Sequence, residues 1–122
     1  MQKNVTIDWY DFQNNIVDKL KYYVGQTEFA DVTLVTKDNK KISAHKIILC
    51  SGSTFFRGLF ARDNGHPNPL LYLRGVEADV LEAVLQFLYL GQAQVRQQDV
   101  QEFIATAEDL GVEGLVKNNE KE

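Results

Sequence analysis

The chain has 122 residues, of which 44% are hydrophobic and 25% charged, the size and composition of one globular domain with a single core. Its formal net charge of −4 argues against a surface that neutralises nucleic-acid phosphates, so we expect no direct nucleic-acid binding. No apolar run approaches the roughly 18 residues that cross a bilayer, and Met1–Tyr10 lacks the pattern of a secretion signal. We therefore expect a soluble, non-secreted chain with no membrane partner.

Soft metal ligands are few in this sequence. Cys50 is the only cysteine, so it cannot form an internal disulfide, and with His45 and His66 it makes too small a set for a structural zinc site. The sequence thus favours a reducing compartment and predicts no metal and no cofactor. The neighbours of Cys50 are apolar, which predicts a small buried side chain rather than a reactive thiol.

The N-terminal segment alternates between apolar and polar residues. Val5, Ile7 and Trp9 are apolar and the residues between them are polar, which is the period of a half-buried strand. No neighbouring segment could pair with it in a hairpin. We therefore predict a strand at Val5–Trp9 whose partner is distant in the chain or belongs to another chain.

An amphipathic helix is predicted from Asp11 to Val24, and Gly25 ends it. Its apolar residues recur at three- and four-residue steps, which places them on one face. These residues are Phe12, Ile16, Leu20, Tyr23 and Val24.

A β-hairpin is predicted next, with strands at Asp31–Thr36 and Lys41–Ala44. The residues between them, Lys37–Lys40, are polar and suit a tight, solvated turn. The following segment, His45–Cys50, is apolar enough to predict a short buried helix.

A further helix is predicted after a break at Ser51–Ser53, with Thr54 as its cap and four large apolar residues beyond it. The segment Arg62–Pro69 contains glycine and two prolines and is predicted to be a loop. A short strand is expected at Leu70–Leu73.

A long helix ended by Gly91 is predicted from apolar residues that share one face. They are Val80, Leu81, Val84, Leu85, Leu88 and Tyr89. A brief strand is expected at Ala93–Val95.

Asp99 and Glu102 have the spacing of a capping box, which predicts the start of a last helix. Gly111 is expected to end it. The charged segment Lys117–Glu122 is predicted to be a tail or the start of a linker.

Several segments resemble, in order, the signature of the BTB/POZ domain family. They are Phe29–Val35, Ile42–Leu49, Ser53–Arg57, Leu71–Val76, Gln86–Tyr89 and Ala107–Gly111. The resemblance covers about Val5 to Leu115. It implies a BTB/POZ domain at residues 1–116 with an α/β (α+β) fold, in which helices flank a small, mainly three-stranded sheet and an N-terminal strand is available for exchange between subunits.

Other residues are similar to those of the tramtrack-type group, which occurs in arthropod transcription and chromatin proteins. They are Val5–Trp9, Gln13, Asn15 and His66–Pro67, whereas Asp8 and Tyr10–Asp11 depart from the group's pattern. The resemblance implies a nuclear protein, commonly with DNA-binding zinc fingers or other motifs far downstream.

The resemblance also implies a homodimer in which the N-terminal strand pairs with the other subunit's sheet and the first helices pack together. That arrangement would supply the missing strand partner. The expected dimer interface comprises Val5, Ile7, Trp9, Phe12, Ile16 and Leu20.

Asp31 and Lys46 align with an acid and a base that the family places in a charged pocket near the dimer interface, associated with partner binding. The alternative is a structural ion pair or a helix cap, because buried charges also arise for architectural reasons. A catalytic role for His45 beside Ser43 is not expected, since no acid is placed to orient it and no oxyanion-hole motif is present.

We therefore expect no enzyme, but a domain for homodimerisation or higher self-association and for partner recruitment in a transcription or chromatin regulator. Its expected partners are itself, other BTB domains and transcriptional co-regulators. The alternative is a substrate adaptor of a cullin-based ubiquitin ligase. Such adaptors carry a hydrophobic-x-Glu motif, from which Phe60–Asp63 departs.

Overall fold

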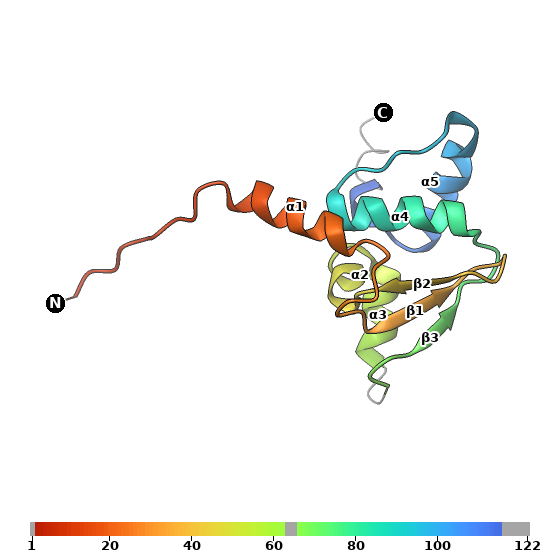
Figure 1. Ribbon diagram of the computed structural model, residues 1–122, viewed down its shortest axis with the longest axis horizontal. Coiled ribbons are helices and arrows are strands. Elements are labelled where there is room, and N and C mark those ends of the chain that lie inside the picture. The colour runs from red at the N-terminus through yellow and green to blue at the C-terminus, as the bar shows by residue number, and fades with distance from the viewer. Residues whose placement is uncertain (1, 63–65, 116–122) are drawn as a thin grey trace.

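Figure 1 shows the computed structural model of the chain, which describes residues 2–62 and 66–115. The N-terminal segment and the start of the first helix project from a body made of the sheet and the other helices. The elements in chain order are α1 (Phe12–Tyr23), β1 (Val32–Val35), β2 (Lys41–Ala44), α2 (Lys46–Gly52), α3 (Thr54–Arg62), β3 (Leu70–Tyr72), α4 (Ala78–Leu90), the 3₁₀-helix η1 (Gln97–Asp99) and α5 (Val100–Asp109).

The sheet has three strands in the order β2-β1-β3. β2 pairs with β1 antiparallel, with Val32 opposite Ala44, and β3 pairs with β1 parallel, with Thr33 opposite Leu70. The β1–β2 turn closes through Asn39, whose φ of 63° is a left-handed conformation that Asn tolerates. The predicted combination of a small three-stranded sheet with flanking helices is confirmed.

The side chain of Asp38 fastens the β1–β2 turn to α4. One carboxylate oxygen accepts hydrogen bonds from the hydroxyl of Thr36 at 2.6 Å and from the N–H of Ala78 at 3.1 Å. The hydrogen bond from Thr36 is the main reason that the pKa of Asp38 lies below its ordinary value. The turn therefore holds the first residue of α4 against the sheet.

The core is built around α4. In Figure 1, α5 lies on one side of α4, and α2 and the sheet lie on the other. The buried residues of α4 are Ala78, Val80, Leu81, Ala83, Val84, Leu85 and Tyr89. All of them except Val80 pack with Val32 and Leu34 of β1 and with Phe103 and Ala107 of α5 in one hydrophobic cluster. This single core matches the expectation from the length of the chain.

Two predicted strands are not formed. Residues 2–9 have no strand partner in the described part of the chain, and Ala93–Val95 runs as a loop. Ala93 and Val95 do pack against the core, but the N–H of Gln94 donates to the side-chain oxygen of Gln86 at 3.2 Å. Both segments have the alternating apolar pattern of a strand. A strand also needs a neighbouring strand with which to form backbone hydrogen bonds.

The two predicted helix caps are wrong. α3 begins at Thr54, and its cap is Ser53, whose hydroxyl accepts the N–H of Phe56 at 3.1 Å. Asp99 makes no capping hydrogen bond, because its carboxylate accepts the Nε–H of Arg96 at 2.7 Å instead. A capping motif in the sequence gives only the residue types. It does not show whether a nearby guanidinium, here that of Arg96, forms the hydrogen bond with the carboxylate instead.

The predicted helix ends are confirmed. Gly91 and Gly111 follow α4 and α5 with φ values of 79° and 64°, in the left-handed conformation that glycine adopts at little cost. The predicted tail, Lys117–Glu122, and Asp63 of the adaptor-motif comparison lie outside the described residues.

Candidate functional site

The N-terminal segment holds its apolar side chains in solvent. Residues 2–9 run away from the body of the domain (Figure 1), and the side chains of Ile7 and Trp9 are 89% and 62% exposed. Val5 is exposed as well. Burying a side chain of this size is worth about 1.5–3 kcal/mol, so a surface that covered this segment would gain substantially.

α1 continues this apolar surface. Phe12 and Ile16 are exposed, Leu20 is half-buried, and the rings of Trp9 and Phe12 lie 5.0 Å apart. No residue of α1 is buried. We refer to the exposed apolar residues of the N-terminal segment and of α1 together as the α1 surface: Val5, Ile7, Trp9, Phe12 and Ile16.

An apolar pocket of about 270 Å³ lies where α1, α2 and α4 meet, next to the α1 surface. Its lining residues are Leu20, Tyr23, Phe29, His45, Ile47, Ile48 and Tyr89. Phe29 and Ile47 are 78% and 74% exposed, so they stand at its mouth. Because Leu20 belongs both to the predicted interface and to this pocket, the two features form one continuous apolar region.

Phe29 and Ile47 were not identified from the sequence as surface residues. For Ile47 a signal was present: it begins the run Ile47-Ile48-Leu49, and three successive residues span about 200° of a helix. A short helix on the surface cannot bury all of that arc. Leu49 is buried and Ile48 half-buried, which leaves Ile47 outside.

His45 is a buried histidine whose ring nitrogens both have partners. Nδ1 lies 2.7 Å from the hydroxyl of Tyr89, and Nε2 lies 2.8 Å from the backbone carbonyl of Glu28. Burial raises the pKa of Tyr89 to about 12. The hydroxyl of Tyr89 is therefore protonated at pH 7, and Tyr89 and His45 together form the floor of the pocket.

Asp31 and Lys46 meet through the backbone of Lys46 and not through its ammonium group. The Asp31 carboxylate accepts the N–H of Lys46, the first residue of α2, at 2.7 Å. The Lys46 ammonium donates to the carbonyl of His66 at 3.1 Å and lies 5.5 Å from the centre of the Phe60 ring. Of the alternatives raised from the sequence, the geometry matches the helix cap; the role in a charged pocket for partner binding stays a prediction.

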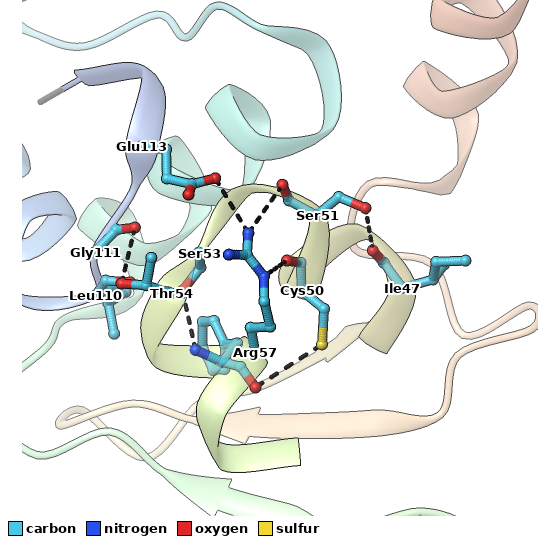
Figure 2. Close-up of polar contacts among 10 residues, drawn as sticks. Ile47, Cys50, Ser51, Ser53, Thr54, Arg57, Leu110, Gly111 and Glu113 are labelled. Atoms are coloured by element: carbon cyan, nitrogen blue, oxygen red, sulfur yellow. Dashed lines mark hydrogen bonds and ion pairs between the residues drawn. The ribbon is translucent and has the colours of Figure 1, made fainter. Parts of the chain in front are cut away.

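Arg57 joins the α2–α3 junction to the C-terminal turn at residues 110–113 (Figure 2). Its Nε donates to the carbonyl of Cys50 at 2.9 Å, and its Nη2 lies 3.1 Å from a carboxylate oxygen of Glu113. The buried hydroxyl of Ser53 donates to the carbonyl of Leu110 beside it. These contacts are structural, because they join two segments of the same domain that are far apart in the sequence.

The described residues offer no obvious place for a metal ion. Within residues 2–62 and 66–115, no three side chains of His, Cys, Asp or Glu gather in a group that could bind one. In the same part of the chain, no helix has the length and apolar character needed to cross a membrane.

Residues 20–122 match the model of the BTB/POZ domain family. The chain belongs to the BTB/POZ domain family. A BTB domain is a protein-interaction fold, so this chain is not an enzyme, and BTB domains generally associate with themselves and with partner proteins.

This BTB domain is similar to parts of longer proteins from Drosophila melanogaster. It is 33% identical to Protein abrupt over 118 residues, which are 97% of this chain and 13% of abrupt. It is 30% identical to Protein tramtrack, alpha isoform, over 114 residues, or 92% of this chain and 14% of tramtrack. It is 29% identical to Transcription activator GAGA over 115 residues, or 94% and 19%.

The fold agrees with a solved BTB structure. The BTB domain of zebrafish PATZ1 superposes with a TM-score of 0.78 at 20% identity, covering 97% of this chain and 96% of that one. The similarity extends over the whole domain, including the mixed sheet and α4.

Proposed function

We propose that this BTB domain forms a homodimer through the α1 surface and the adjoining pocket. The observation that carries the proposal is the exposure of Ile7, Trp9, Phe12 and Ile16 along one continuous segment. Isolated exposed apolar residues are ordinary on a protein surface, whereas a contiguous series marks an interaction site. Aromatic residues such as Trp9 are also the type that dominates binding energy in interfaces.

A symmetric dimer would bring identical helices together and cover both copies of this series at once. Stable dimers of this kind bury on the order of 2,000 Å² or more, with an apolar centre. α1 alone is too short to bury that area. The exposed Phe29 and Ile47, at the mouth of the pocket, extend the apolar region enough for a second α1 to lie across it.

The two predicted strands without partners also support a dimer. Val5–Trp9 and Ala93–Val95 each have a strand-like pattern, and neither is paired with a strand in the described chain. In a twofold dimer the N-terminal segment of one subunit can pair with the loop 92–96 of the other. Each subunit would then gain the strand that it lacks.

We further propose that the domain brings other BTB domains or transcriptional co-regulators to a nuclear transcription or chromatin regulator. Relatives support this, since one of them is named a transcription activator. The domain spans only 13–19% of the abrupt, tramtrack and GAGA proteins, so DNA binding in such a protein would belong to other parts of the chain. The net charge of −4 is consistent with that division of roles.

The experiment that tests the dimer is a solution mass measured by light scattering over a wide range of concentrations. The native chain is expected to have the mass of a dimer, and Ile16→Lys is expected to shift it to the monomer because a charge then enters the apolar centre. Asn14→Lys is the matched control, since residue 14 lies about 160° around α1 from residue 16. A monomeric native chain, or a dimer unaffected by Ile16→Lys, would refute the proposal.

A further inference from the structure

The β3 edge of the sheet, separate from the α1 surface, has backbone groups that no described residue pairs with. β3 is the outer strand in the order β2-β1-β3. The N–H of Thr33 donates to the carbonyl of Pro69, and the N–H of Leu73 also donates to β1. Alternate residues of a strand face the same neighbour, so the N–H and C=O groups of Leu70 and Tyr72 point away from β1 and out of the sheet.

The side chains of the same two residues form an apolar strip. Leu70 and Tyr72 are each 57% exposed, whereas Leu71 between them packs against the core. The strand register places Leu70 beside Thr33 and Tyr72 beside Val35 on the outer face of the sheet, where both β1 residues are half-buried. An extended segment lying along β3 would therefore find backbone groups to pair with and apolar side chains to cover.

The charges on this face of the sheet are positive. The three strands contain one charged residue, Lys41, and no carboxylate. Arg74, two residues after the end of β3, is exposed. Within residues 2–62 and 66–115, neither cation forms an ion pair. The whole chain has a net charge of −4, so this edge has the opposite sign to the average surface and attracts an acidic segment.

A second copy of β3 would not supply that acidic group. An antiparallel pairing of two β3 strands centred on Leu71 would place Arg74 opposite Asn68 of the other copy, and Asn68 is neutral. Both arginines would remain without a carboxylate, and two chains of net charge −4 repel each other. An acidic segment of a different protein fits the charge of this edge better.

We propose that the β3 edge binds an extended acidic segment of a partner protein, which adds a strand antiparallel to β3. Directly opposite residues of an antiparallel pair share a face and can exchange two backbone hydrogen bonds. The segment then has apolar residues opposite Leu70 and Tyr72 and an Asp or Glu opposite Arg74, so it reads acid–x–apolar–x–apolar from its N-terminus. This deepens the partner recruitment proposed above and rests on it, by naming a surface and the chemistry of the partner.

The small size of the contact sets its strength. A strand of three residues buries much less than the roughly 1,000 Å² of a stable pairwise interface, so one segment binds weakly. Backbone hydrogen bonds give such a contact its affinity, and the alternate side chains give it specificity. A partner that carries two such segments would bind a dimer more tightly, because the dimer has two β3 edges.

The test is fluorescence polarisation of a labelled synthetic peptide, Gly-Asp-Glu-Thr-Val-Ser-Val-Gly, titrated with the native chain. Saturable binding is expected. Arg74→Gln is expected to weaken it about two- to fivefold, the range of an exposed ion pair. Gln101→Glu, which makes the same change in net charge at an exposed position of α5, is expected to bind like the native chain.

The apolar strip is tested in the same titration. Leu70→Thr combined with Tyr72→Thr is expected to weaken binding at least about tenfold, because threonine keeps the strand preference and removes most of the apolar surface. Val100→Thr is the matched control, since Val100 is a partly exposed apolar residue of α5, away from this edge. Circular dichroism verifies that each variant is folded.

Two altered peptides test the mode of binding. A methyl group on the backbone nitrogen of the first valine removes the N–H that would donate to the carbonyl of Tyr72, and this peptide is expected not to bind. Lysine in place of both acidic residues is also expected to abolish binding. Either altered peptide binding as well as the original would overturn the proposal, because the contact would then need neither a strand nor an acid.

The remaining outcomes separate this inference from the dimer. A native chain that shows no saturation up to about 1 mM would overturn the inference, while light scattering would still decide the α1 dimer. Binding of the peptide by the Ile16→Lys variant would support an edge that acts independently of the dimer. A native chain that does not bind the peptide but whose solution mass falls in the double threonine variant would show that a second copy occupies the edge, which contradicts the proposal.

Discussion

The hydroxyl of Tyr89 accepts the backbone N–H of His45 at 3.0 Å and lies 2.7 Å from Nδ1 of the same residue. Nε2 of His45 faces the carbonyl of Glu28, which can only accept, so the imidazole proton is on Nε2 and the Tyr89 hydroxyl donates to Nδ1. One hydroxyl therefore joins α4 to the residue that precedes α2 through two hydrogen bonds, and these form the floor of the apolar pocket.

Tyr89→Phe is expected to lower the free energy of unfolding by about 1–3 kcal/mol, because it leaves buried polar groups of His45 without a partner. Urea denaturation measures this change. Tyr72→Phe is the matched control, since Tyr72 is exposed and its loss of a hydroxyl is expected to have little effect on unfolding. Equal stabilities of the two variants would show that the buried hydroxyl contributes nothing net.

The stability of the native chain is expected to fall as the pH rises from about 10 to about 12. Burial raises the folded-state pKa of Tyr89 to about 12 from an ordinary value of 10.0, so the unfolded chain releases this proton first and is increasingly favoured over that interval. Tyr89→Phe removes this contribution. Urea unfolding at a series of alkaline pH values should therefore show a steeper loss for the native chain than for Tyr89→Phe; parallel curves would contradict the assignment.

Asp31→Ala is expected to destabilise the fold by about 1 kcal/mol, because α2 loses the carboxylate that caps its first N–H. An ion pair between Asp31 and the Lys46 ammonium, one of the alternatives raised from the sequence, would instead make Asp31→Asn cost several kcal/mol, because a partly buried cation would lose its partner. Since that ammonium is bound elsewhere and an amide oxygen can still accept the N–H, we now expect Asp31→Asn to have a smaller effect than Asp31→Ala. Thermal melts of the two variants, side by side, give the order; the reverse order would restore the ion-pair interpretation.

Deleting Met1–Asp8 is expected to weaken the dimer, and with it any larger assembly, while leaving the monomer folded. The deletion removes the exposed Val5 and Ile7 together with several backbone groups that can pair with a second subunit, each worth about 1 kcal/mol net when paired. Sedimentation velocity compares it with a shorter deletion of Met1–Lys3, which spares the apolar residues. Identical distributions for the two deletion variants and the native protein would mean that the segment takes no part in association.

The chain is also expected not to bind a cullin, because Phe60–Asp63 departs from the hydrophobic-x-Glu motif of ligase adaptors. Titration of the purified N-terminal domain of a cullin, followed by calorimetry, tests this expectation. Binding at micromolar affinity would contradict this expectation and support the alternative function as a substrate adaptor.

The fold could be predicted from the sequence where local pattern and tertiary environment agree. The β1–β2 hairpin and α4 were expected within a few residues, because each has a clear period and a turn or glycine at its end. Features that depend on distant partners were missed. The exposure of Phe29 depends on where α1 ends, and Ala93–Val95 forms no strand because no other strand lies beside it in the described part of the chain.

The contacts of Arg57 have a mechanical consequence. Arg57 and Ser53 fasten the turn at residues 110–113 to the α2–α3 junction, in the body of the domain, whereas residues 2–9 extend freely from it. A pull on the chain at Leu115 would therefore load the hydrogen bonds of that junction and not the contacts of α1. In the proposed dimer, a load applied at this end of the described domain would not pass through the N-terminal segment.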